Sequence, residues 1–249
     1  MNALAISGAL FIGLSLGLTG AGGSIITLPV LVYVAGLPAK EAVGVSLFVV
    51  GIAALLGAVQ RARAGEFHAR ASLLFALSGM AGATVGARLT PWVPAPVLMT
   101  LFSLLMLTVA LHMWLGRPEG LSLPAECRPM RCLLAGTGVG LLTGFIGVGG
   151  GFLLVPALIK FARLPQRIAT GTSLAVIAFN SAAGFFSHVG EATAHWPLAL
   201  LFAGMAVVGV LLGSFFASRL PVKNLQKGFA LLVFATGVYV LWQNGLSLV

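Results

Sequence analysis

The sequence is short of charged residues, and of negative ones above all. Charged residues make up 8% of the 249 positions, and the five acidic residues are all Glu, with no Asp. Soluble proteins carry roughly 25% charged residues, so a chain of this composition cannot cover a water-exposed surface. Apolar runs separated by short basic stretches fill its whole length, which is typical of a polytopic membrane protein of the all-α class.

Residues for catalysis and for metal or cofactor binding are also scarce. The two cysteines, Cys127 and Cys132, are too few and too widely spaced for a metal or redox centre. The sequence has no Ser/His/Asp set, no paired carboxylates and no H-E-x-x-H, so we expect neither an enzyme nor a metal site. The runs GAGG and GVGGG lack the preceding strand and the later acidic residue of a dinucleotide site, so no cofactor is expected.

The formal net charge of +9 could indicate a protein that binds nucleic acid. Basic residues that flank membrane spans explain this charge better, so nucleic acid is not an expected partner. The N-terminal segment carries no positive charge ahead of its apolar run. We therefore expect it to be part of the membrane domain and not a cleaved signal peptide.

What the sequence does contain is one segment that occurs twice. Residues 17–49 read GLTGAGGSIITLPVLVYVAGLPAKEAVGVSLFV, and residues 144–176, 127 positions later, read GFIGVGGGFLLVPALIKFARLPQRIATGTSLAV. Glycine, proline and serine positions coincide without a gap, which indicates an internal duplication. We expect a first membrane repeat over 1–116, a cytoplasmic linker over 117–130 and a second membrane repeat over 131–249.

Each half contains four apolar segments, and the first of the four is too long for one span. Residues 3–36 would form a helix of about 50 Å, whereas about 20 residues cross a membrane. The glycine cluster lies in the middle, where glycine disfavours a helix. Two short arms that meet at the glycines are the better explanation, as a re-entrant hairpin or a double crossing. The apolar segments are roughly 3–36, 42–60, 71–88, 96–116, 132–161, 168–187, 196–217 and 225–243.

The distribution of Lys and Arg supports this interpretation. If the first segment of each half enters and returns, all but Lys40 and Arg88 of the 14 basic residues share one face. The positive-inside rule makes that face cytoplasmic. An odd number of crossings per repeat then makes the two halves inverted relative to each other, with both termini external. The shared face would hold Arg61, Arg63, Arg70, Arg117, Arg128, Arg131, Lys160, Arg163, Arg167, Arg219, Lys223 and Lys227.

In such an inverted pair the two glycine tips would meet near the middle of the membrane. Each tip exposes backbone N–H groups at the start of a helix, and such groups bind anions. Nearby hydroxyl and amide side chains would complete the shell. The candidate substrate-binding residues are Thr19, Gly20, Gly22, Gly23, Ser24, Ser46, Thr143, Gly147, Gly149, Gly150, Gly151, Thr172, Ser173 and Asn180.

A competing interpretation is helix packing, because small residues let membrane helices approach closely. We expect packing to be the role of the later glycine pairs, Gly82 with Gly86 and Gly209 with Gly213. At the tips, the length of the segment favours a ligand-lining role. The hydroxyls of Ser46 and Ser173 have a second option, which is a hydrogen bond to the preceding turn of their own helix.

With these motifs the chain resembles the TauE/SafE family of membrane permeases, the sulfite exporter group also called DUF81. The resemblance covers nearly all of the chain. It rests on GLTGAGGSIITLP and GFIGVGGGFLLVP, on AVGVSL and ATGTSL after each proline turn, and on GATVGARL. It implies transport of small anions, often sulfur-containing ones such as sulfite, sulfonates or sulfoacetate.

The sequence therefore predicts a secondary transporter of a small anion that works by alternating access between inverted halves. A passive anion channel and a non-transporting accessory protein stay open as alternatives. We expect the chain to lie in the bacterial inner membrane, with the lipid bilayer and a small anionic substrate as its partners. The substrate, the direction, a coupling H⁺ or Na⁺ and the oligomeric state, a homodimer included, are left open.

Overall fold

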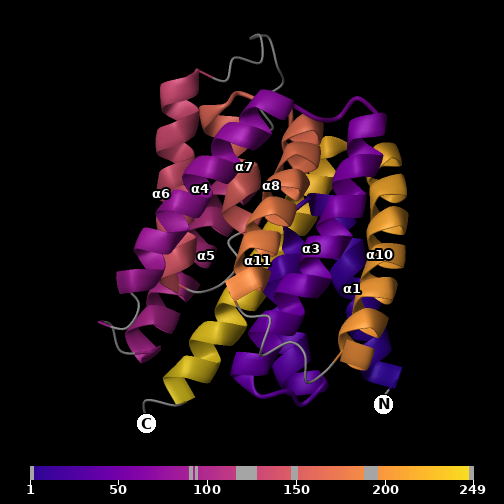
Figure 1. Ribbon diagram of the computed structural model, residues 1–249, viewed down its shortest axis with the longest axis vertical. Coiled ribbons are helices and arrows are strands. Elements are labelled where there is room, and N and C mark those ends of the chain that lie inside the picture. The colour runs from indigo at the N-terminus through magenta and orange to yellow at the C-terminus, as the bar shows by residue number, and fades with distance from the viewer. Residues whose placement is uncertain are drawn as a thin grey trace.

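The computed structural model describes residues 3–89, 92, 95–115, 128–146, 151–187 and 196–246, and these residues form helices and no strand (Figure 1). The first half contains α1 (Ala3–Thr19), α2 (Gly22–Pro29), the π-helix η1 (Val30–Val34), α3 (Ala39–Arg63), α4 (Ala69–Leu89) and α5 (Ala95–Leu115). The second half contains α6 (Pro129–Ile146), α7 (Gly151–Phe161), α8 (Gln166–Ser187), α10 (Trp196–Arg219) and α11 (Val222–Leu246). Helix α6 thus begins two residues before the expected start of the second repeat.

The long first segment is interrupted where its glycine cluster lies. Helix α1 ends at Thr19 and α2 begins at Gly22. The two arms then fold back on each other: a methyl group placed on Gly23 would lie 2.4 Å from the carbonyl oxygen of Ile12, and one on Gly8 would lie 2.9 Å from Val30 Cγ1. These contacts join early residues of one arm to late residues of the other. Residues 3–34 therefore form a hairpin with its tip at residues 20–21.

The returning arm of this hairpin changes its winding after Pro29. Proline has no N–H to donate to the preceding turn, and residues Val30–Val34 continue as a π-helix. The N–H of Ala35 donates to the carbonyl of Val30 at 2.9 Å, five residues back instead of four. This wider turn was not expected from the sequence.

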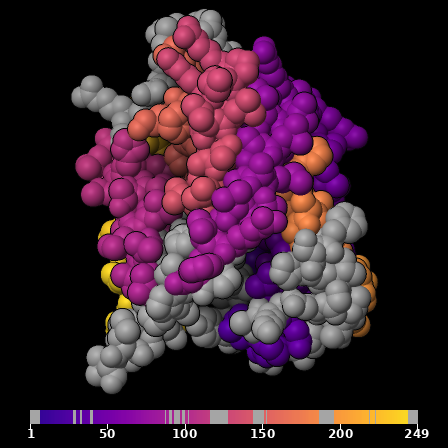
Figure 2. All heavy atoms as spheres, turned by 60° about the vertical axis from the view of Figure 1, so that its left-hand side comes forward, coloured from indigo at the N-terminus to yellow at the C-terminus, as the bar shows by residue number. Residues whose placement is uncertain are grey.

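Glycines also allow α1 to pack along α10, and α4 to pack along α6. A methyl group on Gly13 would lie 2.0 Å from the carbonyl oxygen of Ala206, and one on Gly140 would lie 2.1 Å from that of Gly79. The two contacts are equivalent in the repeat, because Gly140 lies 127 positions after Gly13 and Ala206 lies 127 positions after Gly79. Figure 2 shows α4 and α6 side by side on one face of the molecule.

A second pair of equivalent contacts lies on the same helices. A methyl group on Gly82 would lie 2.3 Å from the carbonyl oxygen of Thr137, and one on Gly209 would lie 2.3 Å from that of Leu10. Real side chains do not tolerate such distances, so the packing role expected for Gly82 and Gly209 is confirmed. Gly213 has the same role, since its added methyl would meet the carbonyl oxygen of Leu14 at 2.4 Å.

Helices α3 and α8 form the central pair and run in opposite directions. A methyl group on Gly57 would lie 3.2 Å from Leu174 Cδ1, and one on Gly184 would lie 3.3 Å from Leu47 Cδ1. Later residues of α3 thus meet earlier residues of α8, and the reverse. Here too the two contacts are equivalent at the spacing of 127 residues.

Four helices within the described part of the chain are long and apolar enough to cross a membrane, judged by length and composition. They belong to α3, α8, α10 and α11 and cover Glu41–Arg63, Gln166–Phe185, Trp196–Ala217 and Lys223–Trp242. Three further apolar stretches are shorter, at Ser7–Thr19, Gly22–Val32 and Ser103–Leu115. The two arms of the first hairpin are among these shorter stretches, because the break at residues 20–21 divides the long apolar segment in two.

The glycine contact between α1 and α10 leads to a test by substitution. Gly209→Ala should lower the midpoint of thermal unfolding in detergent, since the new methyl would force the two helices apart at a cost of about 1–3 kcal/mol. Gly204→Ala, on the same helix, is the control, because nothing lies within 4 Å of its added methyl. It should be neutral or slightly stabilising, since alanine is the better helix former. Equal midpoints for the two variants would contradict the close packing.

Candidate functional site

Thr19 organises the tip of the first hairpin. Its hydroxyl donates to the carbonyl of Ser15 at 2.8 Å and accepts a hydrogen bond from the N–H of Gly22 at 2.9 Å. The side chain thus satisfies one of the N–H groups that the start of α2 leaves without an acceptor. Both functions of the hydroxyl are therefore engaged within the tip. Thr19 shapes the candidate site and does not face it with a free donor.

Gly20 seats the tip on the first two turns of α8. Its φ of +77° lies in the left-handed region, where glycine is favoured. A methyl group on Gly20 would lie 2.6 Å from Thr170 Cγ2 and 2.8 Å from the Thr170 carbonyl oxygen. The Ser173 hydroxyl lies 2.9 Å from the carbonyl oxygen of Gly20 and 2.8 Å from that of Thr170, and shares its proton between them. Ser173 thus joins its own helix to the tip of the other half.

The beginnings of α2 and α7 lie together. A methyl group on Gly151, the first residue of α7, would lie 2.6 Å from Ser24 Oγ and 3.4 Å from the Ala21 carbonyl oxygen. The N–H of Gly22 is held by Thr19, and helix geometry gives those of Gly23 and Ser24 no acceptor within α2. Two helix N-termini, each with partial positive charge, therefore converge from the two halves of the chain. Such a place suits a small anion.

Gly22 and Gly23 have a packing role as well. A methyl group on Gly22 would lie 2.5 Å from Ser15 Oγ, and Gly23 meets the carbonyl oxygen of Ile12. These two glycines let the hairpin arms approach each other. Substitutions there would disturb the hairpin itself, so Gly151 is the better position for a test of ligand binding.

The other predicted residues lie in several environments. The Thr143 hydroxyl donates to the carbonyl of Gly140 on its own helix at 2.9 Å. The Thr172 hydroxyl is buried and accepts the N–H of His68 at 3.1 Å, which ties the α3–α4 connection to α8. Ser46 is half-buried on α3, and the Asn180 Oδ1 is buried on α8 with no hydrogen-bond partner in the described part of the chain. Three predicted residues, Gly147, Gly149 and Gly150, lie outside the described residues.

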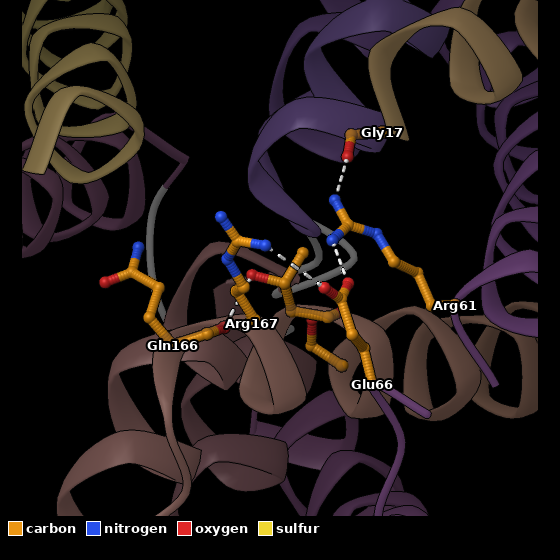
Figure 3. A network of polar contacts seen from close by, with 7 residues as sticks. Gly17, Arg61, Glu66, Gln166 and Arg167 are labelled. Atoms are coloured by element: carbon orange, nitrogen blue, oxygen red, sulfur yellow. Dashed lines mark hydrogen bonds and ion pairs between the residues drawn. The ribbon is translucent and has the colours of Figure 1, made fainter. Parts of the chain in front are cut away.

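A network of ionic contacts near the tip was missed in the sequence analysis. Arg61, expected among the basic residues at the membrane surface, is 3% exposed. Its guanidinium donates to the carbonyl oxygen of Gly17 at 2.9 Å and pairs with the Glu66 carboxylate, which also faces Arg167 (Figure 3). The signal available was local: Glu66, one of only five acidic residues, follows Arg61 by five positions.

A cavity of about 550 Å³ lies elsewhere, between α3 and α8. Its lining is almost entirely apolar, with four phenylalanines at positions 48, 67, 179 and 185 and a single hydroxyl side chain, that of Ser181. Such a lining offers an anion almost no hydrogen-bond donors. The candidate anion site is therefore the meeting point of α2 and α7.

Comparison with known proteins identifies one family for this chain. The family model described as Sulfite exporter TauE/SafE matches residues 5–240. A probable membrane transporter protein of Xylella fastidiosa is 34% identical over 245 residues, covering 96% of this chain and 94% of that protein. No solved structure matches the chain.

More distant relatives carry the same description. A probable membrane transporter protein of Methanocaldococcus jannaschii is 24% identical over 245 residues, with 92% of this chain and 91% of that protein covered. One of Bacillus subtilis is 24% identical over 237 residues, with 93% and 96% covered. The glycine-broken first segment and the near full-length match lead to one conclusion: this chain is a membrane transporter of the sulfite exporter TauE/SafE family.

Proposed function

We propose that this protein is a secondary transporter that binds a small anion between the N-termini of α2 and α7 and carries it by alternating access. The observation that carries the proposal is the contact of Gly151 with Ser24 and Ala21, which brings the two helix beginnings together. Backbone N–H groups and helix dipoles are fixed in place, so they bind an oxyanion without a charged side chain. Ser24 has the hydroxyl nearest to Gly151, and in this structure that hydroxyl donates to the carbonyl of Ala21 at 2.9 Å.

Alternating access is commonly built on two inverted repeats that surround one substrate site and open it to either side of the membrane in turn. The equivalent glycine contacts at a spacing of 127 residues, together with the opposite directions of α3 and α8, are what inverted repeats would produce. In this arrangement each half contributes the beginning of one short helix, α2 or α7, to a common centre. The first helix of each half packs on a long helix of the other half, α1 on α10 and α6 on α4, so each of these pairs would move as one unit.

The substrate class follows from the chemistry of the site. Donors without formal charge, close to one another, favour a small oxyanion over a large organic acid. The description of the family as sulfite exporters supports a sulfur oxyanion such as sulfite, a sulfonate or sulfoacetate.

For the orientation, we propose the bacterial inner membrane with the basic connections in the cytoplasm. The contact between Arg167 and Glu66 puts the α3–α4 and α7–α8 connections at one end of the molecule. The start of α1 and the end of α11 both lie at the opposite end, on different sides of the molecule (Figure 1). That agrees with termini outside the cell and basic loops inside it.

Gly151→Ala tests the site directly. The added methyl would lie 2.6 Å from Ser24 Oγ and force the two helix ends apart, so we expect sulfite or sulfoacetate uptake into proteoliposomes to fall about tenfold or more, the equivalent of about 1.4 kcal/mol of binding. Ser24 Oγ and Ile177 Cδ1, the nearest obstacles, are side-chain ends that can shift, so the variant should fold. Saturating uptake in the wild type would indicate a transporter, and uptake linear in concentration would indicate a channel.

Two variants separate ligand binding from packing. In the double variant Ser24→Ala/Gly151→Ala the nearest clash is relieved, so thermal stability should recover while uptake stays low. Gly138→Ala adds the same methyl where nothing lies within 4 Å, and it should transport normally. Full uptake by Gly151→Ala, or recovery of uptake in the double variant, would refute the site.

Reporter fusions test the orientation. Green fluorescent protein should be fluorescent, and alkaline phosphatase inactive, when fused after Ala64 or after Arg163, because both connections are proposed to be cytoplasmic. A fusion after Gly36, at the far end of the hairpin, should give the opposite pattern. Opposite results for Ala64 and Arg163 would contradict the inverted arrangement.

A further inference from the structure

Arg61 lies in an unusual position for a charged residue of a membrane protein. Its side chain is 4% exposed, while those of Glu66 and Arg167 are 16% and 41% exposed. The guanidinium donates to the carbonyl oxygen of Gly17, near the end of α1, and pairs with one oxygen of Glu66. The Arg61 Nε is buried and has no hydrogen-bond partner among the described residues. The buried guanidinium therefore keeps an unused donor.

The second carboxylate oxygen of Glu66 lies 3.7 Å from Arg167 Nη1 (Figure 3). One carboxylate thus stands between two guanidinium groups, so the cluster carries an excess of positive charge. Arginine binds the oxygens of carboxylates, sulfonates and phosphates with the same fork of donors. A carboxylate held in this way has the charge and the acceptor geometry of a small oxyanion.

This cluster adjoins the tip of the first hairpin. A methyl group on Gly171 would lie 1.9 Å from the Glu66 carbonyl oxygen and 2.9 Å from Arg61 Cβ, so the α3–α4 connection rests directly on α8. The neighbouring residues Thr170 and Ser173 hold Gly20. From the exposed Arg167 to the buried Arg61, the positive charges therefore lead from the surface toward the tip.

We propose that Arg61 and Arg167 form a second anion site on the route to the α2–α7 site, and that Glu66 occupies it when no substrate anion is bound. An incoming oxyanion displaces the Glu66 carboxylate and takes its place on Arg61. This inference rests on the proposed anion transport. The Arg61–Glu66 pair occurs in the first half of the chain only. The equivalent positions of the second half, 127 residues later, are His188 and Thr193, which cannot form such a pair.

Glu66→Gln is the test. When a ligand competes with a tethered group, its apparent affinity equals its intrinsic affinity multiplied by the fraction of sites that the group leaves free. If Glu66 occupies the site nine-tenths of the time, its neutralisation should tighten the binding of sulfoacetate about tenfold, measured by calorimetry in detergent without sulfonate buffers. Glu41→Gln, which removes the same charge from the first turn of α3, should bind as the wild type does.

Two further variants keep the test decisive if Glu66→Gln folds poorly. Glu66→Asp keeps the charge but withdraws it by one methylene, and it should tighten binding to a smaller extent. Arg61→Gln/Glu66→Gln leaves no unpaired buried charge, and it should fold without the gain in affinity. Unchanged or weaker binding in both Glu66→Gln and Glu66→Asp would overturn the proposal, as would an equal gain in the double variant.

Flux measurements separate this inference from the proposed function. Wild-type uptake that saturates, with no gain in affinity for the Glu66 variants, would overturn the second site and leave the transporter intact. A gain in affinity without uptake by any variant would support the anion site and contradict transport.

Discussion

The structure depends on one constraint: a helix that breaks inside a membrane must find partners for the backbone groups it frees. The break after Thr19 exposes carbonyls at the end of α1 and N–H groups at the start of α2. The Thr19 hydroxyl takes the N–H of Gly22, Ser173 donates to the carbonyl of Gly20, and Arg61 donates to that of Gly17. In hydrocarbon, each group left alone would cost several kcal/mol. The N–H groups of Gly23 and Ser24, which have no acceptor within α2, are those the account assigns to substrate.

Satisfying the tip also explains how the rest of the molecule is arranged. Ser173 comes from the second half and Arg61 from the far end of α3, so the tip is held only when α3 and α8 lie against it. Glycines such as Gly13 and Gly140 bring the remaining helices within backbone contact, which membrane proteins need because lipid provides little drive for helices to associate. The pairs α1–α10 and α4–α6 each contain one helix from either half, so such a pair, and not a half of the chain, would move as a rigid unit.

Local features of the sequence predicted much of this. The length of residues 3–36, set against the glycines at 20–23, predicted the break at its observed place, and the G-x-x-x-G spacing predicted the packing of Gly82 and Gly209. The burial of Arg61 was not predictable in this way, because it depends on Gly17 and Gly171, which are 44 and 110 positions away in the sequence. For the same reason the hydrogen bond from the N–H of His68 to the Thr172 hydroxyl, 104 positions apart, was not predictable. The π-helix after Pro29 depends on which carbonyl each N–H selects, four or five residues back, and the hydropathy pattern carries no information on that choice.

The central claim is that an anion lies between the beginnings of α2 and α7. Selenite has the shape and charge of sulfite, and its selenium can be located by anomalous scattering in crystals of the protein grown with the anion. The account predicts a selenium peak between the two helix beginnings, placed so that the selenite oxygens lie at hydrogen-bond distance from the N–H groups of Ser24 and Gly151, and its loss in Gly151→Ala. A saturated protein with no peak at that position, or with its only peak in the apolar cavity between α3 and α8, would contradict the claim.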